Sequence, residues 1–150
     1  MTPVPFLLAI AYRAMTEDFH ARLAELDREP LRPAHGYTFR YLAENPEATT
    51  VGLAEFLGVT KQAASKAVAE LHNWGYVERK PHPTDRRAHI VALTERGWEY
   101  LGVADRLWGE VERGLADVIG AGQVAAMADS LGAYIDHVSG GRSAPPRPVW

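Results

Sequence analysis

Apolar residues recur at three- and four-residue steps along most of this chain, which predicts a mainly helical fold. A first long helix is predicted from Pro3 or Pro5 to about Glu29, because prolines are tolerated in a first turn. The PLRP motif that follows breaks this pattern. A short second helix is then predicted, which stops before Asn45–Pro46 because a proline disfavours helical geometry in the residue before it.

Two short helices joined by a tight turn are predicted in the middle of the chain. The first has Thr50 as its N-cap and ends at Gly58, and the second has Thr60 as its N-cap and ends at Gly75. Apolar side chains give the second helix one buried face. Its opposite face carries two cations and otherwise short or hydrogen-bonding side chains, which suits the major groove of DNA: Lys61, Gln62, Ala63, Ser65, Lys66 and Ala69.

After Gly75 the pattern changes from helical to alternating, which predicts a hairpin of two strands, Tyr76–Lys80 and Ala88–Leu93. The connecting loop, PHPTDRR, is stiffened by its prolines. Its tip places Asp85 beside Arg86 and Arg87, so one arginine can be held by the aspartate while the other projects outward. A projecting arginine fits a narrow, electronegative minor groove.

A long amphipathic helix capped by Thr94 is predicted up to about Ile119, followed by a further helix that continues until Ser139. So small a chain cannot bury the apolar stripes of its first and last helices by itself. We therefore expect a homodimer, whose two-fold symmetry would match a palindromic operator.

The predicted fold class is mainly α with a small β-hairpin wing. Residues 1–30 and 95–139 are expected to form a helical dimerisation region contributed by both termini, and residues 31–94 a winged helix-turn-helix. Residues 140–150, which are rich in proline, are expected to be a flexible tail. These regions are predicted to be parts of one compact chain rather than independent domains.

The net charge of −3 argues mildly against a nucleic-acid partner, but the charge is unevenly distributed. Residues 60–93 carry six basic and three acidic side chains, whereas the segments on either side each carry five basic and eight acidic ones. Cysteines are absent, which excludes disulfides and thiol chemistry. Because the chain has neither a long apolar run nor a secretory signal, we expect a soluble cytoplasmic protein without a membrane partner.

The segment LAEFLGVTKQAASKAVAELHNWGYVERKPHPTDRRAHIVALTERG resembles the core of the MarR family of winged-helix regulators. The resemblance rests on Gly75, on Arg79, on the Asp-basic-Arg wing tip and on the Thr-Glu-Arg-Gly helix start, and it implies binding to double-stranded DNA. It places Arg87 at the wing arginine that enters the minor groove, steadied by Asp85. His82 stands where the family often has an acid. The family's recognition-helix positions correspond here to Thr60, Lys61, Gln62, Ala63, Ser65 and Lys66.

Related proteins often hold an effector between the dimerisation helices and the DNA-binding lobe. Four side chains are candidates for lining such a pocket, with core packing as the alternative for each: Tyr12, His20, His35 and Tyr37. The resemblance therefore predicts a transcriptional regulator, namely a repressor that a small-molecule effector releases from DNA.

The six histidines show no metal-binding spacing, and no phosphate-binding loop or nucleophile motif is present. We therefore expect no metal, no cofactor and no enzyme activity. Two alternatives stay open, namely a winged-helix protein–protein adaptor without DNA binding and an enzyme that carries a winged-helix dimerisation module.

Overall fold

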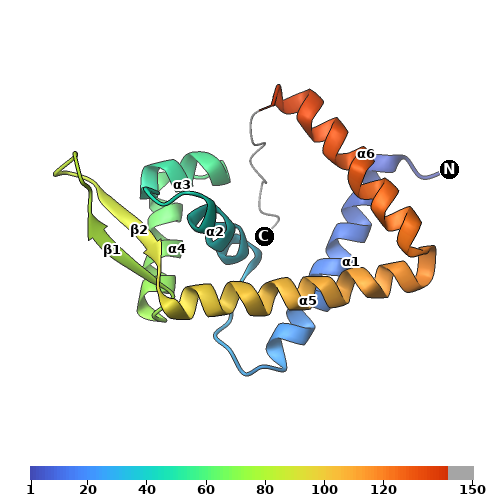
Figure 1. The fold of residues 1–150 in the computed structure, drawn as a ribbon, viewed down its shortest axis with the longest axis horizontal. Coiled ribbons are helices and arrows are strands. Elements are labelled where there is room, and N and C mark those ends of the chain that lie inside the picture. The colour runs from blue at the N-terminus through green and yellow to red at the C-terminus, as the bar shows by residue number, and fades with distance from the viewer. Residues whose placement is uncertain (142–150) are drawn as a thin grey trace. The chain divides into compact units, whose positions relative to one another are not determined.

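The structure, a computed structural model, describes residues 1–141 and divides them into two compact units (Figure 1). The first unit contains α1 (Val4–Ala24), the part of α5 (Glu95–Ile119) from Ala104 onward, and α6 (Ala121–Ser139). The second unit, Glu29–Val103, contains α2 (Pro33–Glu44), α3 (Thr50–Leu57), α4 (Lys61–Asn73), β1 (Val77–Pro81), β2 (His89–Leu93) and the first residues of α5. Most of the predicted tail lies outside the described residues.

The predicted order of six helices and one hairpin is confirmed, with three differences at helix ends. The first helix stops at Ala24 instead of Glu29, and Asp27 in the turn that follows has a positive φ of 51°. The helix α4 ends at Asn73 instead of Gly75, and Gly75 follows it with a positive φ of 79°. The N-cap of α3 is Thr49 rather than Thr50, because the Thr49 hydroxyl oxygen accepts a hydrogen bond from the Gly52 N–H (3.1 Å).

The turn between α3 and α4 forms as Gly58 and Thr60 predicted. Gly58 ends α3 with a left-handed φ of 65°, a conformation that glycine adopts without strain. Thr60 begins α4, and its hydroxyl oxygen accepts a hydrogen bond from the Ala63 N–H (3.1 Å). The apolar face of α4 is buried as expected, at Ala64, Ala67, Val68 and Leu71.

The hairpin is antiparallel, with a register that runs from Val77 opposite Leu93 to Pro81 opposite His89. Its second strand is also tied to the loop before α3, since the Val91 N–H donates a hydrogen bond to the Ala48 carbonyl (2.8 Å). Figure 1 shows the two strands extending together to a shared tip. The base of the hairpin is therefore fixed to the helices, while its tip projects from them.

An aromatic core and a set of polar contacts around Glu29 hold the second unit together. Phe39, Tyr76 and Tyr100 are buried with their ring centroids 4.3 to 5.6 Å apart. Glu29 accepts hydrogen bonds from the Tyr76 hydroxyl and the Arg96 guanidinium, and that guanidinium lies 4.5 Å from the centroid of the Tyr76 ring. Burial by itself would raise the pKa of Glu29, but the Tyr76 hydrogen bond and the charge of Arg96 outweigh it and lower that pKa.

In the first unit, the Phe19 ring stacks on Trp108 at a centroid distance of 4.2 Å, and Arg22 bridges Asp18 and Glu110. Large apolar side chains elsewhere on α1 and α6 are exposed, namely Val4, Phe6, Leu7, Ile10, Tyr134, Ile135 and Val138. Within residues 1–141, no single helix has the length and apolar character needed to cross a membrane. The bent pair of α5 and α6, which changes direction by 114°, meets those two criteria only when counted together.

Candidate nucleic-acid interface

The exposed face of α4 carries most of the side chains that the sequence marked for DNA contact. Lys61, Gln62, Ala63 and Lys66 are exposed, and Ser65 is half-buried. Thr60 is exposed too, but its hydroxyl oxygen already caps the helix. Short side chains thus lie between the two lysines on this face, a composition that suits the major groove of DNA.

The loop between β1 and β2 brings the other predicted residues together at the wing tip. Asp85, Arg86 and Arg87 are all exposed. The Asp85 carboxylate accepts a hydrogen bond from the backbone N–H of Arg87 (2.9 Å). Within the described residues it forms no ion pair with either guanidinium, so the expectation that it holds one arginine side chain is wrong. Asp85 instead fixes the backbone, because a two-residue turn lets a carboxylate reach the N–H more readily than the guanidinium.

Two further exposed cations of the second unit were not among the predicted contacts. Arg79 and Lys80 are exposed on β1, and the Lys80 ammonium lies 3.0 Å from the Glu78 carboxylate. Their exposure could have been anticipated from the predicted hairpin, since two strands alone have no third strand to cover charged residues at their outer end. Basic side chains thus follow both α4 and the wing.

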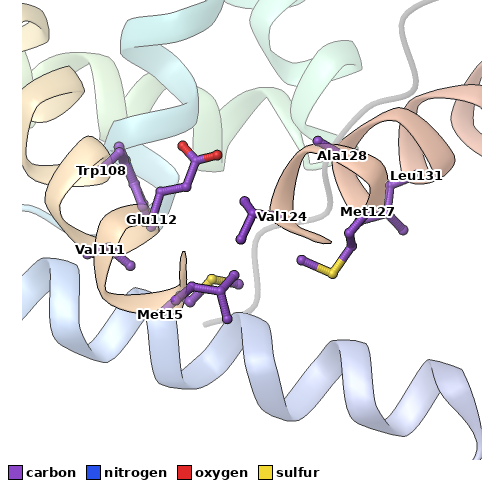
Figure 2. A pocket seen from close by; sticks show the side chains of 9 residues that line it. Met15, Trp108, Val111, Glu112, Val124, Met127, Ala128 and Leu131 are labelled. Atoms are coloured by element: carbon purple, nitrogen blue, oxygen red, sulfur yellow. The ribbon is translucent and has the colours of Figure 1, made fainter. Parts of the chain in front are cut away.

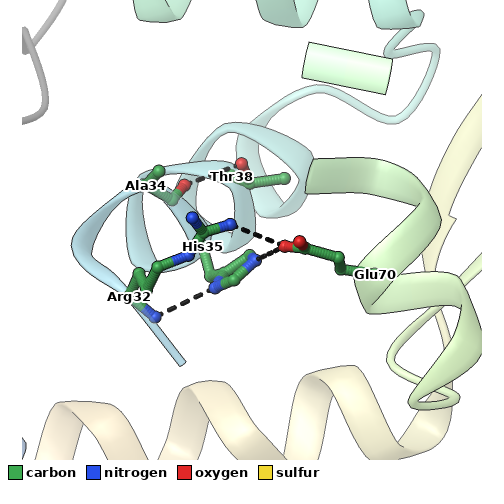
Figure 3. A network of polar contacts seen from close by, with 5 residues as sticks. All are labelled: Arg32, Ala34, His35, Thr38 and Glu70. Carbon is green, nitrogen blue, oxygen red and sulfur yellow. Dashed lines mark hydrogen bonds and ion pairs between the residues drawn. The ribbon is translucent and has the colours of Figure 1, made fainter. Parts of the chain in front are cut away.

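The position of α4 in the second unit is set by a polar network that the sequence did not reveal (Figure 3). His35, at the start of α2, is fully buried; its Nδ1 accepts a hydrogen bond from the Arg32 N–H (2.9 Å) and its Nε2 lies 2.8 Å from the Glu70 carboxylate of α4. The Arg32 guanidinium donates to the same carboxylate oxygen (2.7 Å). These bonds fasten the inner face of α4 to α2.

Burial, hydrogen bonds and neighbouring charges all shift the pKa values of His35 and Glu70. Burial lowers the pKa of His35, the hydrogen bond with Glu70 raises it, and the charge of Arg32 lowers it again, with a net lowering. The pKa of Glu70 is also lowered, since the His35 hydrogen bond and the Arg32 charge outweigh the effect of burial. Because Nδ1 accepts a hydrogen bond from the Arg32 N–H, the ring carries its proton on Nε2, which donates to the Glu70 carboxylate.

The four candidate effector residues fall in different units. Tyr12 and His20 are half-buried on α1 in the first unit, and burial lowers the pKa of His20. Tyr37 is half-buried on α2 in the second unit. His35, with both ring nitrogens bonded, packs as a core residue. Ligand contact at these positions stays a prediction.

The first unit contains an open apolar pocket of about 270 Å³, to which α1, α5 and α6 each contribute (Figure 2). Met15, Trp108, Val124 and Met127 are among its lining side chains, and Glu112 is the one charged residue in the lining. None of the four candidate effector residues lines this pocket. Among residues 1–141, no three histidine, aspartate or glutamate side chains form a cluster that could hold a metal ion.

Comparisons with known proteins agree with this architecture. A model of the MarR family matches residues 30–88, which include α2, α3, α4 and the hairpin loop. The HTH-type transcriptional regulator PetP of Rhodobacter capsulatus is 32% identical over 103 residues. That alignment covers 69% of this chain and 58% of PetP, so the chain spans little more than half the length of this curated relative.

Solved structures share the fold at low sequence identity. Wild-type MarR from E. coli in its apo form is 23% identical, with a TM-score of 0.75 over 90% of this chain and 98% of that one. A MarR transcriptional regulator from Methanosarcina mazei Go1 is 19% identical, with a TM-score of 0.75 over 89% of this chain and 94% of that one. The winged helix-turn-helix with helices from both termini is thus the fold of this chain.

Proposed function

This chain belongs to the MarR family, and on that premise we propose that it is a transcriptional regulator that binds double-stranded DNA sequence-specifically as a homodimer. The observation that carries the proposal is the joint exposure of the α4 face and the wing tip in one compact unit. Lys61 and Lys66 lie on the first, and Arg86 and Arg87 on the second. The proposal assigns no catalytic step to the chain and places it in the cytoplasm.

Each part of this surface has a separate role. Gln62 and Ser65 read base edges in the major groove, where a side-chain amide can form two hydrogen bonds with adenine. Lys61 and Lys66 neutralise phosphates, which strengthens binding to every sequence. Arg87 enters the adjacent minor groove, with the wing backbone held by Asp85. Specificity and affinity therefore come from different side chains.

The dimer follows from the exposed apolar side chains of the first unit. Phe6 and Val4 on α1 are each 65% exposed, and Tyr134 on α6 is 64% exposed. Burying such groups against the same helices of a second copy removes apolar area from water, which is the main favourable term in association. Two-fold symmetry then places the two α4 helices about 34 to 36 Å apart. This distance is one turn of the DNA double helix, which is the half-site spacing of a palindromic operator.

We further propose that this spacing is what an effector controls, so that the protein acts as a repressor released by a small molecule. Tyr12, His20 and Tyr37 stay candidates for the ligand contacts, as half-buried aromatic groups outside the DNA-facing surface. A ligand that binds a mis-spaced dimer about 100-fold more tightly than the DNA-competent one shifts the equilibrium by about 2.7 kcal/mol. Such a shift is enough to empty an operator.

The salt dependence of binding tests the proposal. Arg87→Ala should weaken binding to all duplexes and make the slope of log affinity against log salt concentration less negative by roughly 1, because one positive charge near the phosphates is lost. Gln62→Ala should leave that slope unchanged and reduce the preference for the operator over other duplexes by about 1 to 3 kcal/mol. Fluorescence anisotropy with labelled duplexes at several salt concentrations measures both.

The matched control is Arg106→Ala, which removes an exposed arginine of α5 outside the wing and should leave affinity and slope unchanged. If Arg87→Ala behaved like this control, the wing would not contact DNA. If the wild-type chain bound no duplex selected from genomic fragments, the adaptor alternative would replace DNA binding.

A further inference from the structure

The first turn of the wing loop is held by the imidazole of His82. Its Nδ1 lies within hydrogen-bond distance of two backbone donors, the N–H of Asp85 (3.0 Å) and the N–H of Thr84 (3.2 Å). His82 directly follows Pro81, the last residue of β1, so these bonds turn the chain at the point where the hairpin ladder ends. One side-chain atom thereby satisfies two loop N–H groups.

The rest of the loop is built on that turn. The Ala88 N–H donates to the Asp85 carbonyl (3.2 Å), and the Asp85 carboxylate accepts from the Arg87 N–H (2.9 Å). Arg86 lies between these bonded residues and is exposed. The direction in which both arginines leave the loop therefore depends on Asp85, and the backbone of Asp85 depends on His82.

An imidazole nitrogen accepts a hydrogen bond only when it carries no proton. The two bonds to Nδ1 thus require the neutral ring with its proton on Nε2. Protonation would break both of these bonds, because an Nδ1–H cannot accept, and it would turn Nδ1 into a donor toward the Thr84 hydroxyl oxygen, 3.4 Å away. A carboxylate at this position would accept the same bonds but would bring a negative charge, whereas the neutral imidazole accepts them without one.

We propose that His82 is a positioning residue for DNA binding: its neutral imidazole shapes the wing tip so that Arg86 and Arg87 reach the minor groove, and its protonation releases the tip. This inference rests on the proposed function and adds a pH dependence to it. Besides His82, the charged and titratable groups of the wing are Glu78, Arg79 and Lys80 on β1, His89 on β2, and Asp85, Arg86 and Arg87 in the loop. Protonation also adds a positive charge near the phosphates, which by itself would tighten binding. Weaker binding at low pH would therefore indicate loss of the loop hydrogen bonds, and tighter binding would indicate an effect of charge alone.

The test compares the wild-type chain with His82→Asn, because the asparagine side-chain oxygen can accept the same bonds and does not titrate. Affinity for one duplex selected from genomic fragments is measured at pH 7.5 and 5.5 at constant ionic strength. At pH 7.5 the two proteins should bind within about twofold of each other, whereas at pH 5.5 the wild type should bind about fivefold more weakly than His82→Asn. His82→Ala should bind about fivefold more weakly than wild type at pH 7.5.

His137→Asn, which changes an exposed histidine on α6, is the matched control and should follow the wild-type pH profile. Other histidines contribute equally to wild type and to His82→Asn, so the difference between these two isolates His82. Equal pH profiles for them, or wild-type binding that tightens at pH 5.5 relative to His82→Asn, would overturn the inference and leave DNA binding itself intact.

Amide hydrogen exchange of the free protein gives a readout that does not depend on DNA. The amides of Thr84 and Asp85 should be protected at pH 7.5 and lose relative protection at pH 5.5 in wild type but not in His82→Asn. Absence of this protection at pH 7.5 would contradict the hydrogen bonds to His82 Nδ1. If neither the wild type nor any variant bound a duplex, the proposed function would be overturned and the positioning role with it. This would hold even if hydrogen exchange supported the bonds to His82 Nδ1.

Discussion

His35 is a buried titratable side chain whose two ring nitrogens both have hydrogen-bond partners. Burial is the largest cause that lowers its pKa below the ordinary value of 6.5. In the unfolded chain the ring takes up a proton as the pH falls through about 6.5, whereas in the folded chain it stays neutral to lower pH. The unfolded state therefore binds more protons in this range, so the free energy of unfolding decreases as the pH falls and levels off below the folded pKa.

The prediction is that wild type loses more stability than His35→Gln between pH 7.5 and 5.5, in urea unfolding followed by circular dichroism. At pH 7.5 the variant should be less stable by about 1 to 3 kcal/mol, because Glu70 and the Arg32 N–H lose a buried partner. His137→Gln, at an exposed position, should match the wild-type pH dependence. Parallel stability curves for wild type and His35→Gln would show that this ring does not titrate as described.

At the scale of single residues, sequence patterns identified the side chains that face outward better than those that hold the site in place. Helical periodicity assigned Gln62 and Lys66 to the exposed face of α4, because that assignment needs only local spacing. The partner of His35 is Glu70, which is 35 residues away, and no local pattern connects the two. The role of His82 was hidden for another reason, since its partners are backbone groups that every loop possesses.

At the scale of elements, the junction between the hairpin and α5 depends on one close approach. A side-chain carbon at Gly97 would collide with the carbonyl oxygen of Tyr76 and crowd Leu93. This explains the glycine in the Thr-Glu-Arg-Gly start of α5, where Thr94 caps the helix through the Gly97 N–H (3.2 Å). The base of the wing is thus packed against the first turn of α5.

Gly97→Ala should therefore destabilise the protein by about 1 to 3 kcal/mol, because the new methyl group forces the backbone at Tyr76 to move. Gly102→Ala is the matched control on the same helix, since nothing lies within 4 Å of its added carbon. It should be neutral or stabilise by up to about 1 kcal/mol through helix propensity. Urea midpoints of the two variants decide the matter, and equal effects would contradict the close approach.

The turn between α3 and α4, which local chemistry sets, was predicted well, whereas the end of α1, which distant contacts set, was not. Gly58 and Thr60 fix the helix-turn-helix through bonds to residues three or four positions away. The end of α1 was placed too late because Leu26 continues the apolar spacing, yet Leu26 is 42% exposed. The following segment instead leads to Glu29, which is bound by Arg96, 67 residues further along.

At the scale of the whole molecule, the proposed function requires two copies of the chain, since one α4 helix covers a single half-site. Composition anticipated this requirement, because the apolar stripes of the first and last helices exceed what one small chain can bury. The exposed apolar residues of α1 and α6 agree with that reasoning. Neither the sequence nor the fold specifies which bases Gln62 and Ser65 would read, because that choice depends on the docked geometry of individual side chains.

Hydroxyl-radical footprinting of the wild-type protein on duplexes selected from genomic fragments tests the central claim most directly. The account predicts two symmetric protected windows whose centres lie about 10 base pairs apart, one for each α4 helix of a dimer. Arg87→Ala should lose the protection that flanks these windows in the minor groove while the two central windows remain. A single window, or protection that is the same on every duplex, would contradict sequence-specific binding by a two-fold symmetric dimer.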